Sequence, residues 1–171
     1  MVVTYLIVGL FVTSSNTIVL ADMSEENGAC DTLFNDMLLD QTCCISERFP
    51  EDQSKCKIPE DEDKMCDFYK CVVAEQNVLT DDEIDEGKLK EFFDQWEKDY
   101  PKEKAMTLRA RTGCLNGKYL EYINKDNCLE ARLYFCMYIN SFMECQSWKE
   151  SDRCTKVKEH AQKCKDVQGM K

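Results

Sequence analysis

Apolar residues recur at helical spacing along most of this chain. No segment alternates apolar and polar residues for long enough to predict a strand. The first periodic segment is Cys30–Thr42, which ends at the vicinal pair Cys43-Cys44. Its predicted inward face consists of Leu33, Phe34, Met37 and Leu38. The pattern therefore predicts an all-α protein.

A second helix is predicted at Lys64–Val78, directly after the acidic run Glu60–Asp63. Acidic side chains favour a helix N-terminus because they complement the helix dipole. A calcium loop would need regularly spaced ligands and a central glycine, which this run lacks. The predicted inward face comprises Met65, Cys66, Tyr69, Val72 and Val73.

The segment Thr80-Asp81-Asp82-Glu83 matches a capping box and predicts the start of a third helical unit. Gly87 is expected to break or bend this unit, and Pro101 to stop it. Between them lies an aromatic stripe that either belongs to an ordinary core or lines a pocket. It consists of Leu89, Phe92, Phe93, Trp96 and Tyr100.

Residues 102–111 are locally basic, with one acidic residue, Glu103. They form either a solvated helix face or a patch that recognises an anion. The cations are Lys102, Lys104, Arg109 and Arg111.

The segment Cys128–Cys145 is apolar on nearly every side and is therefore predicted to be a buried central helix. Ser151 is expected to cap a last helix, whose end Lys165–Lys171 is predicted to fray. The inward positions of this last helix are Cys154, Val157, Ala161 and Cys164. Together these patterns predict one domain, residues 22–171, built as a compact bundle of about six to eight short helices around the central one.

Residues 1–21 are predicted to be a cleaved signal peptide, because the apolar run Val2–Val12 precedes a cleavage site at Ala21. A transmembrane anchor is the alternative. It would need about 20 predominantly apolar residues, and the polar stretch Thr13–Thr17 interrupts the run. The protein is therefore expected to be secreted and extracellular.

Twelve cysteines occur in the 171 residues, and in an oxidising compartment an even number predicts a disulfide framework. Zinc and redox sites are disfavoured because the sequence has no Cys-x-x-Cys motif and one histidine, His160. The pairing is not fixed by sequence. The cysteines are Cys30, Cys43, Cys44, Cys56, Cys66, Cys71, Cys114, Cys128, Cys136, Cys145, Cys154 and Cys164.

The formal net charge is −11. Such a charge disfavours nucleic acid as a partner and stable association with anionic membranes. No base accompanies a nucleophile in a recognisable catalytic motif, so no enzymatic activity, metal or cofactor is expected. A disulfide-braced helical bundle instead suits a small hydrophobic ligand. The candidate ligand-binding residues are Phe92, Phe93, Trp96, Phe135, Tyr138, Ile139, Phe142 and Met143, and the candidate orienting groups are Tyr138, Asn140 and Ser141.

The cysteine spacings resemble those of insect odorant-binding proteins, in particular the extended Plus-C group. The resemblance covers the whole mature chain. It rests on Cys43-Cys44 followed by a proline and Cys56, on forty-two residues between Cys71 and Cys114, and on an eight-residue gap between two cysteines. That gap occurs at Cys136–Cys145 and again at Cys145–Cys154, and the second placement fits the Plus-C pattern better. The remaining elements are Cys66, Cys136 and Cys164.

What the resemblance implies is a helical carrier of odorants, pheromones or similar molecules in an insect fluid. It also implies an interlocked disulfide scheme: Cys66 with Cys145, Cys114 with Cys154, and Cys71 with Cys43 or Cys44. A secreted salivary or venom-type interaction protein, which binds a protein or a charged small molecule, is the alternative function. Whether the protein forms a homodimer is left open by the sequence.

Overall fold

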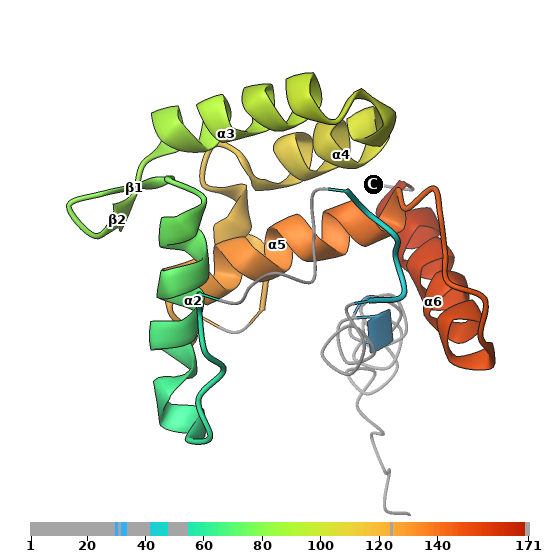
Figure 1. Cartoon of the computed structure of the whole chain (residues 1–171), viewed down its shortest axis with the longest axis horizontal. Helices are drawn as coiled ribbons and strands as arrows, with labels where there is room; N and C mark the ends of the chain where they lie inside the picture. The colour runs from blue at the N-terminus through green and yellow to red at the C-terminus, as the bar shows by residue number, and fades with distance from the viewer. Residues whose placement is uncertain (1–29, 31, 34–41, 48–54, 124, 170–171) are drawn as a thin grey trace, which may run out of the picture.

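The computed structural model describes residues 30, 32–33, 42–47, 55–123 and 125–169 (Figure 1). The predicted signal peptide, residues 1–21, lies outside them. Of the first predicted helix, Leu33 is described and buried, whereas Phe34, Met37 and Leu38 fall outside the described residues.

The described residues contain five α-helices, fewer than the six to eight expected, together with three 3-10 helices and one two-stranded hairpin. The fold is thus helical and stapled by disulfides, as the sequence predicts. The α-helices are α2 (Met65–Glu75), α3 (Glu86–Asp99), α4 (Lys104–Cys114), α5 (Leu129–Met143) and α6 (Asp152–Gly169). The shorter elements are η1 (Glu62–Lys64), β1 (Leu79–Thr80), β2 (Glu83–Ile84), η2 (Pro101–Glu103) and η3 (Lys118–Glu121).

Helix α5 is the centre of the molecule, which confirms the prediction made from its apolar sequence. Every residue from Ala131 to Met143 is buried. Helix α4 lies along it and α3 packs against α4, while α2 packs at one end of α5 and α6 at the other (Figure 1). Because neighbours surround it, α5 needs no polar face.

Helix α2 follows the acidic run as predicted, since η1 begins within that run and continues into the helix. The helix ends at Glu75 rather than at Val78. The reason is Asn77, whose backbone is left-handed at φ 56° and whose N–H donates to the carbonyl of Ala74 at 2.8 Å. Of the predicted inward positions, Tyr69, Val72 and Val73 are buried, whereas Cys66 is exposed and Phe68 takes a buried place.

The predicted capping box is wrong, because Thr80 and Glu83 pair as the two strands of a hairpin. Asp81 and Asp82 form its turn with φ angles of 51° and 66°, a conformation that short polar side chains tolerate. The N-cap of α3 is Asp85, whose carboxylate accepts from the N–H groups of Gly87 at 2.8 Å and Lys88 at 3.0 Å.

Gly87 therefore lies within the first turn of α3 and does not break it, contrary to the expectation. The aromatic stripe on this helix faces inward, with Leu89, Phe93 and Trp96 buried. The helix ends at Asp99, shortly before Pro101, as predicted.

Helix α6 begins where predicted, and the hydroxyl of Ser151 accepts from the N–H of Cys154 at 3.1 Å. The four predicted inward positions are all buried. The predicted fraying is wrong up to Gly169, because the helix continues to that residue and the ammonium of Lys165 pairs with Glu144 at 2.8 Å. Residues 170–171 lie outside the described residues.

All twelve cysteines form disulfides. The pairing implied by the resemblance is wrong, because α4 lies along α5 and α2 packs at the start of α5, so their cysteines find partners there. Cys66 bonds Cys128, Cys114 bonds Cys136, and Cys71 bonds Cys56. The other three bonds are Cys30–Cys164, Cys43–Cys154 and Cys44–Cys145.

The six bonds fall into two groups by their order along the chain. Three of them interlock within residues 56–136. The other three are nested, so that cysteines in successive positions from 30 to 44 bond cysteines in reverse order from 164 to 145. The nested group fastens the two ends of the described chain to each other.

Candidate functional site

A pocket of about 430 Å³ lies between the C-terminal end of α5, the loop that follows it, and α6. This volume is within the range of small-molecule sites in proteins. The lining residues are Phe142, Met143, Cys145, Trp148, Thr155, Lys158, Glu159, Ala161 and Gln162.

One wall of the pocket is apolar. Phe142 and Met143 come from the last turn of α5 and are buried. The indole of Trp148 meets the ring of Phe142 edge-on, with the ring centroids 5.9 Å apart. The indole N–H donates to the carbonyl of Cys145 at 3.2 Å. Because this bond satisfies the polar edge of the indole, its apolar surface can face a ligand.

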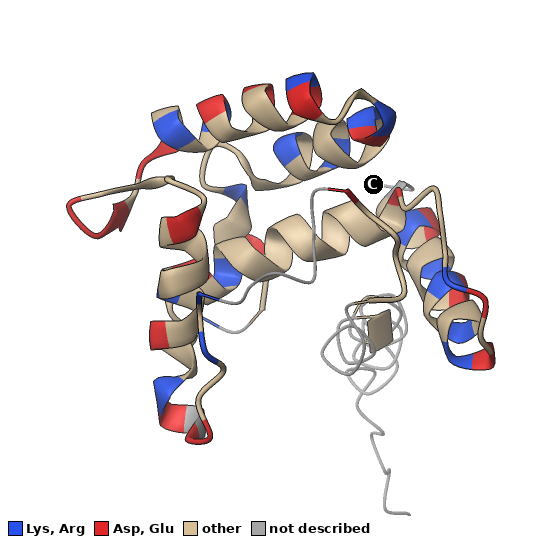
Figure 2. Ribbon diagram, viewed as in Figure 1, with Lys and Arg blue, Asp and Glu red and all other residues tan. Residues whose placement is uncertain are grey.

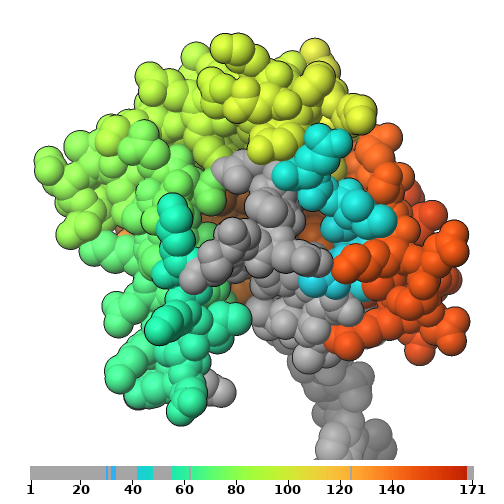
Figure 3. Space-filling view, viewed as in Figure 1, coloured from blue at the N-terminus to red at the C-terminus, as the bar shows by residue number. Residues whose placement is uncertain are grey.

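Residues 43–45 hold the loop of this wall in place. They pair antiparallel with residues 147–149, since Ile45 N–H donates to Ser147 at 2.8 Å and Lys149 N–H donates to Cys43 at 2.9 Å. The Cys44–Cys145 disulfide closes the same contact. Figure 3 shows residues 42–47 in cyan against the orange C-terminal part of the chain. The pocket wall is therefore fixed covalently as well as by hydrogen bonds.

The opposite wall is polar and belongs to one face of α6, because Thr155, Lys158, Glu159 and Gln162 are spaced by three, one and three residues. The Thr155 hydroxyl donates to the carbonyl of Ser151 at 2.9 Å, and the Gln162 amide donates to Asp166 at 2.7 Å. Within the described part of the chain, no hydrogen bond or ion pair holds the charged group of Lys158 or Glu159.

Comparison with known proteins adds nothing to this geometry. No protein-family model, curated protein sequence or solved structure matches the chain. Within the described ranges, no helix is long and apolar enough to span a membrane, and no group of three or more His, Cys, Asp or Glu is placed to hold a metal ion.

The structure brings two of the eight predicted ligand-binding residues, Phe142 and Met143, to this pocket. Phe135, Tyr138 and Ile139 are buried further along α5, and the ring of Tyr138 lies 6.4 Å from that of Phe142. On α3, the three predicted residues contact one another and do not line this pocket. They are Phe92, Phe93 and Trp96.

The aromatic residues of α5 continue toward α2. The ring of Tyr134 lies 4.4 Å from that of Tyr138 and 5.1 Å from that of Tyr69 on α2. Burial, and to a lesser degree the neighbouring Tyr134, raise the pKa of Tyr69 to about 12. This row of rings therefore joins the pocket end of α5 to the packing at α2.

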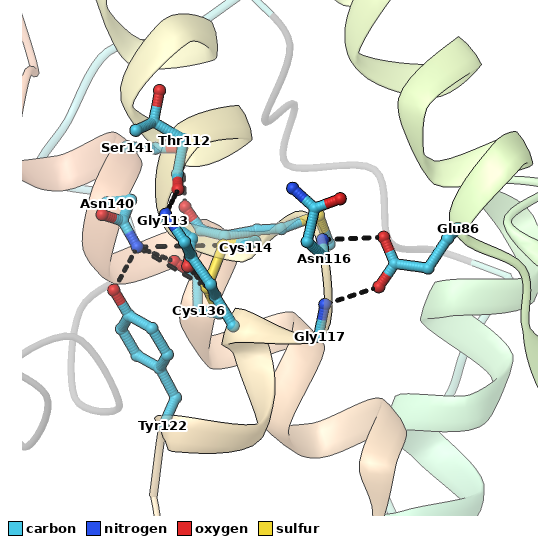
Figure 4. Close-up of a disulfide and its surroundings, with 12 residues drawn as sticks. Glu86, Thr112, Gly113, Cys114, Asn116, Gly117, Tyr122, Cys136, Asn140 and Ser141 are labelled. Atoms are coloured by element: carbon cyan, nitrogen blue, oxygen red, sulfur yellow. Dashed lines mark hydrogen bonds between the residues drawn. A yellow bond between two sulfur atoms is a disulfide. The ribbon is translucent and has the colours of Figure 1, made fainter.

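Asn140 and Ser141 serve the fold rather than the pocket. The Asn140 amide donates to the Tyr122 hydroxyl and to the carbonyl of Cys136, both at 2.8 Å (Figure 4). The Ser141 hydroxyl donates to the carbonyl of Met137 at 2.7 Å. Neither residue lines the pocket, so the polar side of the site is supplied by α6 instead.

The sequence did not indicate the α6 residues or Trp148 as part of a site. A signal was present, because Trp148 is an isolated aromatic residue in a polar loop and the α6 residues share one helical face. That face is polar, however, and a polar helical face ordinarily faces solvent. Its role depends on the approach of α5, which is a tertiary contact.

The basic segment 102–111 is neutralised by carboxylates of neighbouring elements. Lys104 pairs with Glu97 at 2.9 Å and Lys102 with Glu47 at 3.7 Å. Arg109 pairs with Glu144 and Arg111 with Asp94, and these two side chains are 23% and 25% exposed. The segment is thus neither a fully solvated face nor an open anion site.

Proposed function

We propose that the protein is a secreted carrier of small hydrophobic ligands, related to the insect odorant-binding proteins. The observation that carries the proposal is the pocket between α5 and α6, with its apolar wall of Phe142, Met143 and Trp148. A ligand that buries roughly 300 Å² of apolar surface gains on the order of 7 kcal/mol before the cost of association. Loose, micromolar binding is the expected result.

The order of disulfides supports this relationship, in a register different from the one that the sequence suggested. The six cysteines from Cys56 to Cys136 pair first with third, second with fifth and fourth with sixth. This is the interlocked order that the resemblance implies. Seven residues separate Cys128 from Cys136, where the family has eight. The nested bonds would then be the additions of the Plus-C group.

Secretion is supported by the complete oxidation of the cysteines. Disulfides persist in oxidising compartments and are rare in the cytosol, and every cysteine of this chain is in one. A carrier in an extracellular fluid also gains from bonds that hold its pocket wall in place, as Cys44–Cys145 does here.

Displacement of a fluorescent apolar dye, N-phenyl-1-naphthylamine, tests the carrier function. We expect saturable binding by the secreted protein and displacement by long-chain alcohols. Ala161→Phe should weaken binding, because Ala161 is buried and lines the pocket. Ala74→Phe, at an exposed position of α2, is the matched control and should bind as the wild type does.

Trp148→Ala provides a second variant, which enlarges the pocket where Ala161→Phe fills it. It should weaken dye binding while circular dichroism shows the same helix content. If the dye binds saturably and neither Ala161→Phe nor Trp148→Ala changes its affinity, this pocket is not the ligand-binding site. If the folded protein binds no apolar probe, the proposed carrier function is wrong.

A further inference from the structure

We infer that the pocket selects amphiphiles with an anionic head, of the long-chain carboxylate class, and that Lys158 is the residue that pairs with the head group. This inference rests on the proposed carrier function and names its ligand class. The apolar wall would hold the chain of such a ligand, and the face of α6 would meet its head at the mouth of the pocket.

The net charge of −11 would, by itself, favour a cationic ligand. The acidic residues are concentrated elsewhere, however. Residues 60–86 hold eleven acidic residues and two lysines, and they form α2 and the hairpin, at the opposite end of α5 from α6 (Figure 2). At physiological salt, exposed charges are screened beyond about 8 Å. The charges of α6 and of the adjoining loop therefore decide which ligand the pocket prefers. In that loop, Glu144 is paired with Arg109 and Lys165, and Glu150 is adjacent to Lys149.

Helix α6 carries more cations than anions. It has three acidic residues, of which Glu159 is at the pocket, and five basic residues, of which Lys158 is at the pocket. The five are Arg153, Lys156, Lys158, Lys163 and Lys165.

The two charged groups at the pocket mouth differ in their helical neighbours. Residues three or four apart face each other on a helix, whereas adjacent residues do not. Glu159 has Lys156 three residues before it and Lys163 four residues after it. Lys158 has no acidic residue at any of these distances. Among the described residues, neither charge is held by an ion pair, but Glu159 has two cations at neighbouring positions of the helix, whereas Lys158 has no anion at such a position. The ammonium of Lys158 is therefore the less compensated of the two charges.

The test compares dodecanoate, dodecanol and dodecylammonium at neutral pH, each as a competitor of the naphthylamine dye. We expect dodecanoate to bind several-fold more tightly than dodecanol, the modest gain of an exposed ion pair, and dodecylammonium to bind most weakly. The advantage of dodecanoate should shrink as salt is added.

Variants assign the preference to one residue. Lys158→Gln should remove the advantage of dodecanoate over dodecanol, and Lys158→Glu should reverse it in favour of dodecylammonium. Arg153→Gln, on the same helix but outside the pocket lining and not three or four residues from Glu159, is the control and should keep the wild-type order.

The outcomes separate this inference from the carrier function. If dodecanol and dodecylammonium displace the dye as well as dodecanoate does, the pocket is a carrier site without the inferred charge selectivity. A preference for dodecanoate that survives Lys158→Gln would overturn the role of Lys158. If none of the three displaces the dye, the carrier function fails as well.

Discussion

The side chain of Asn140 on α5 lies against Gly113 of α4, so that a Cβ atom added at Gly113 would be 2.6 Å from the side-chain oxygen of Asn140 (Figure 4). The Cys114–Cys136 disulfide joins the same two helices one residue away. Asn140 cannot turn aside freely, because its amide donates to Tyr122 and to the carbonyl of Cys136. The glycine is what lets the two helices approach.

Gly113→Ala should therefore destabilise the fold, although alanine is the better helix former by about 1 kcal/mol. We expect the free energy of unfolding to fall by about 1–2 kcal/mol, since overpacking against a fixed neighbour outweighs the helix preference. Chemical denaturation measures it. In an Asn140→Ala background, the same substitution should cost less or stabilise the protein. Equal effects in the two backgrounds would contradict the contact.

Substitution of Asp85 tests the observed N-cap of α3. The N–H of Lys88 first, and then the hydroxyl of Thr80 and the N–H of Gly87, hold the pKa of Asp85 below its ordinary value. A lowered pKa in the folded state stabilises the protein above the ordinary aspartate pKa, and this contribution is lost as the pH falls toward the folded value. Wild-type stability should therefore decline in acid partly through this group.

Asp85→Asn should keep the cap but lose that part of the pH dependence, because asparagine caps as well as aspartate does. Asp85→Ala should lower the melting temperature by a few degrees at neutral pH. Thermal melts at neutral and acid pH distinguish the two variants. A larger fall in melting temperature for Thr80→Ala than for Asp85→Ala would support a capping box at Thr80 and contradict the hairpin.

Tyr69 predicts an alkaline transition. Its pKa is raised to about 12 in the folded protein, above the ordinary tyrosine value of about 10. The neutral hydroxyl therefore stabilises the fold fully below pH of about 10, and this contribution is lost as the pH rises toward 12. Tyr69→Phe should flatten stability in that range. In a titration followed by tyrosinate absorbance, Tyr69→Phe should lack one group that ionises at high pH in the wild type. An unchanged titration curve would contradict the raised pKa of Tyr69.

Disulfide mapping tests the connectivity. Non-reducing digestion and mass spectrometry should recover Cys66 linked to Cys128 and Cys114 linked to Cys136. Recovery of Cys66 linked to Cys145 instead would restore the pairing that the resemblance implies.

Removing a bond tests its energetic contribution. Replacing Cys56 and Cys71 together by alanine opens a loop with a sequence separation of 15 residues, which should lower the free energy of unfolding by about 3 kcal/mol. The variant protein should still bind the naphthylamine dye, because neither cysteine lines the pocket. Loss of dye binding by folded variant protein would place the site nearer to α2.

The helices were readable from the sequence to different degrees. The apolar sequence of α5 and the inward cysteines of α6 predicted burial that the structure shows. An apolar face of a helix is stable only when other elements cover it, so the pattern alone predicts burial. The hairpin at Thr80 was missed, because the same four residues fit a capping box and a tight turn equally well. Only the backbone of Asp81 and Asp82 separates the two.

The site was readable in part. Phe142 and Met143 belong to an apolar helix that any sequence reading would single out, and they do line the pocket. Lys158 and Glu159 belong to a polar face, which becomes a pocket wall when the end of α5 and Trp148 lie opposite it. The α6 sequence shows that these residues share one face, but not that α5 and Trp148 lie opposite that face.

The amino-acid sequence by itself determined that the chain is helical, that α5 is the buried centre, and that its cysteines suit disulfides, because periodicity and composition act along the chain. The tertiary structure decided which cysteines pair and where the pocket lies. A disulfide requires two Cβ atoms within a few ångströms of each other, and a pocket requires two faces from different elements. Both depend on distances in space that sequence separation does not determine.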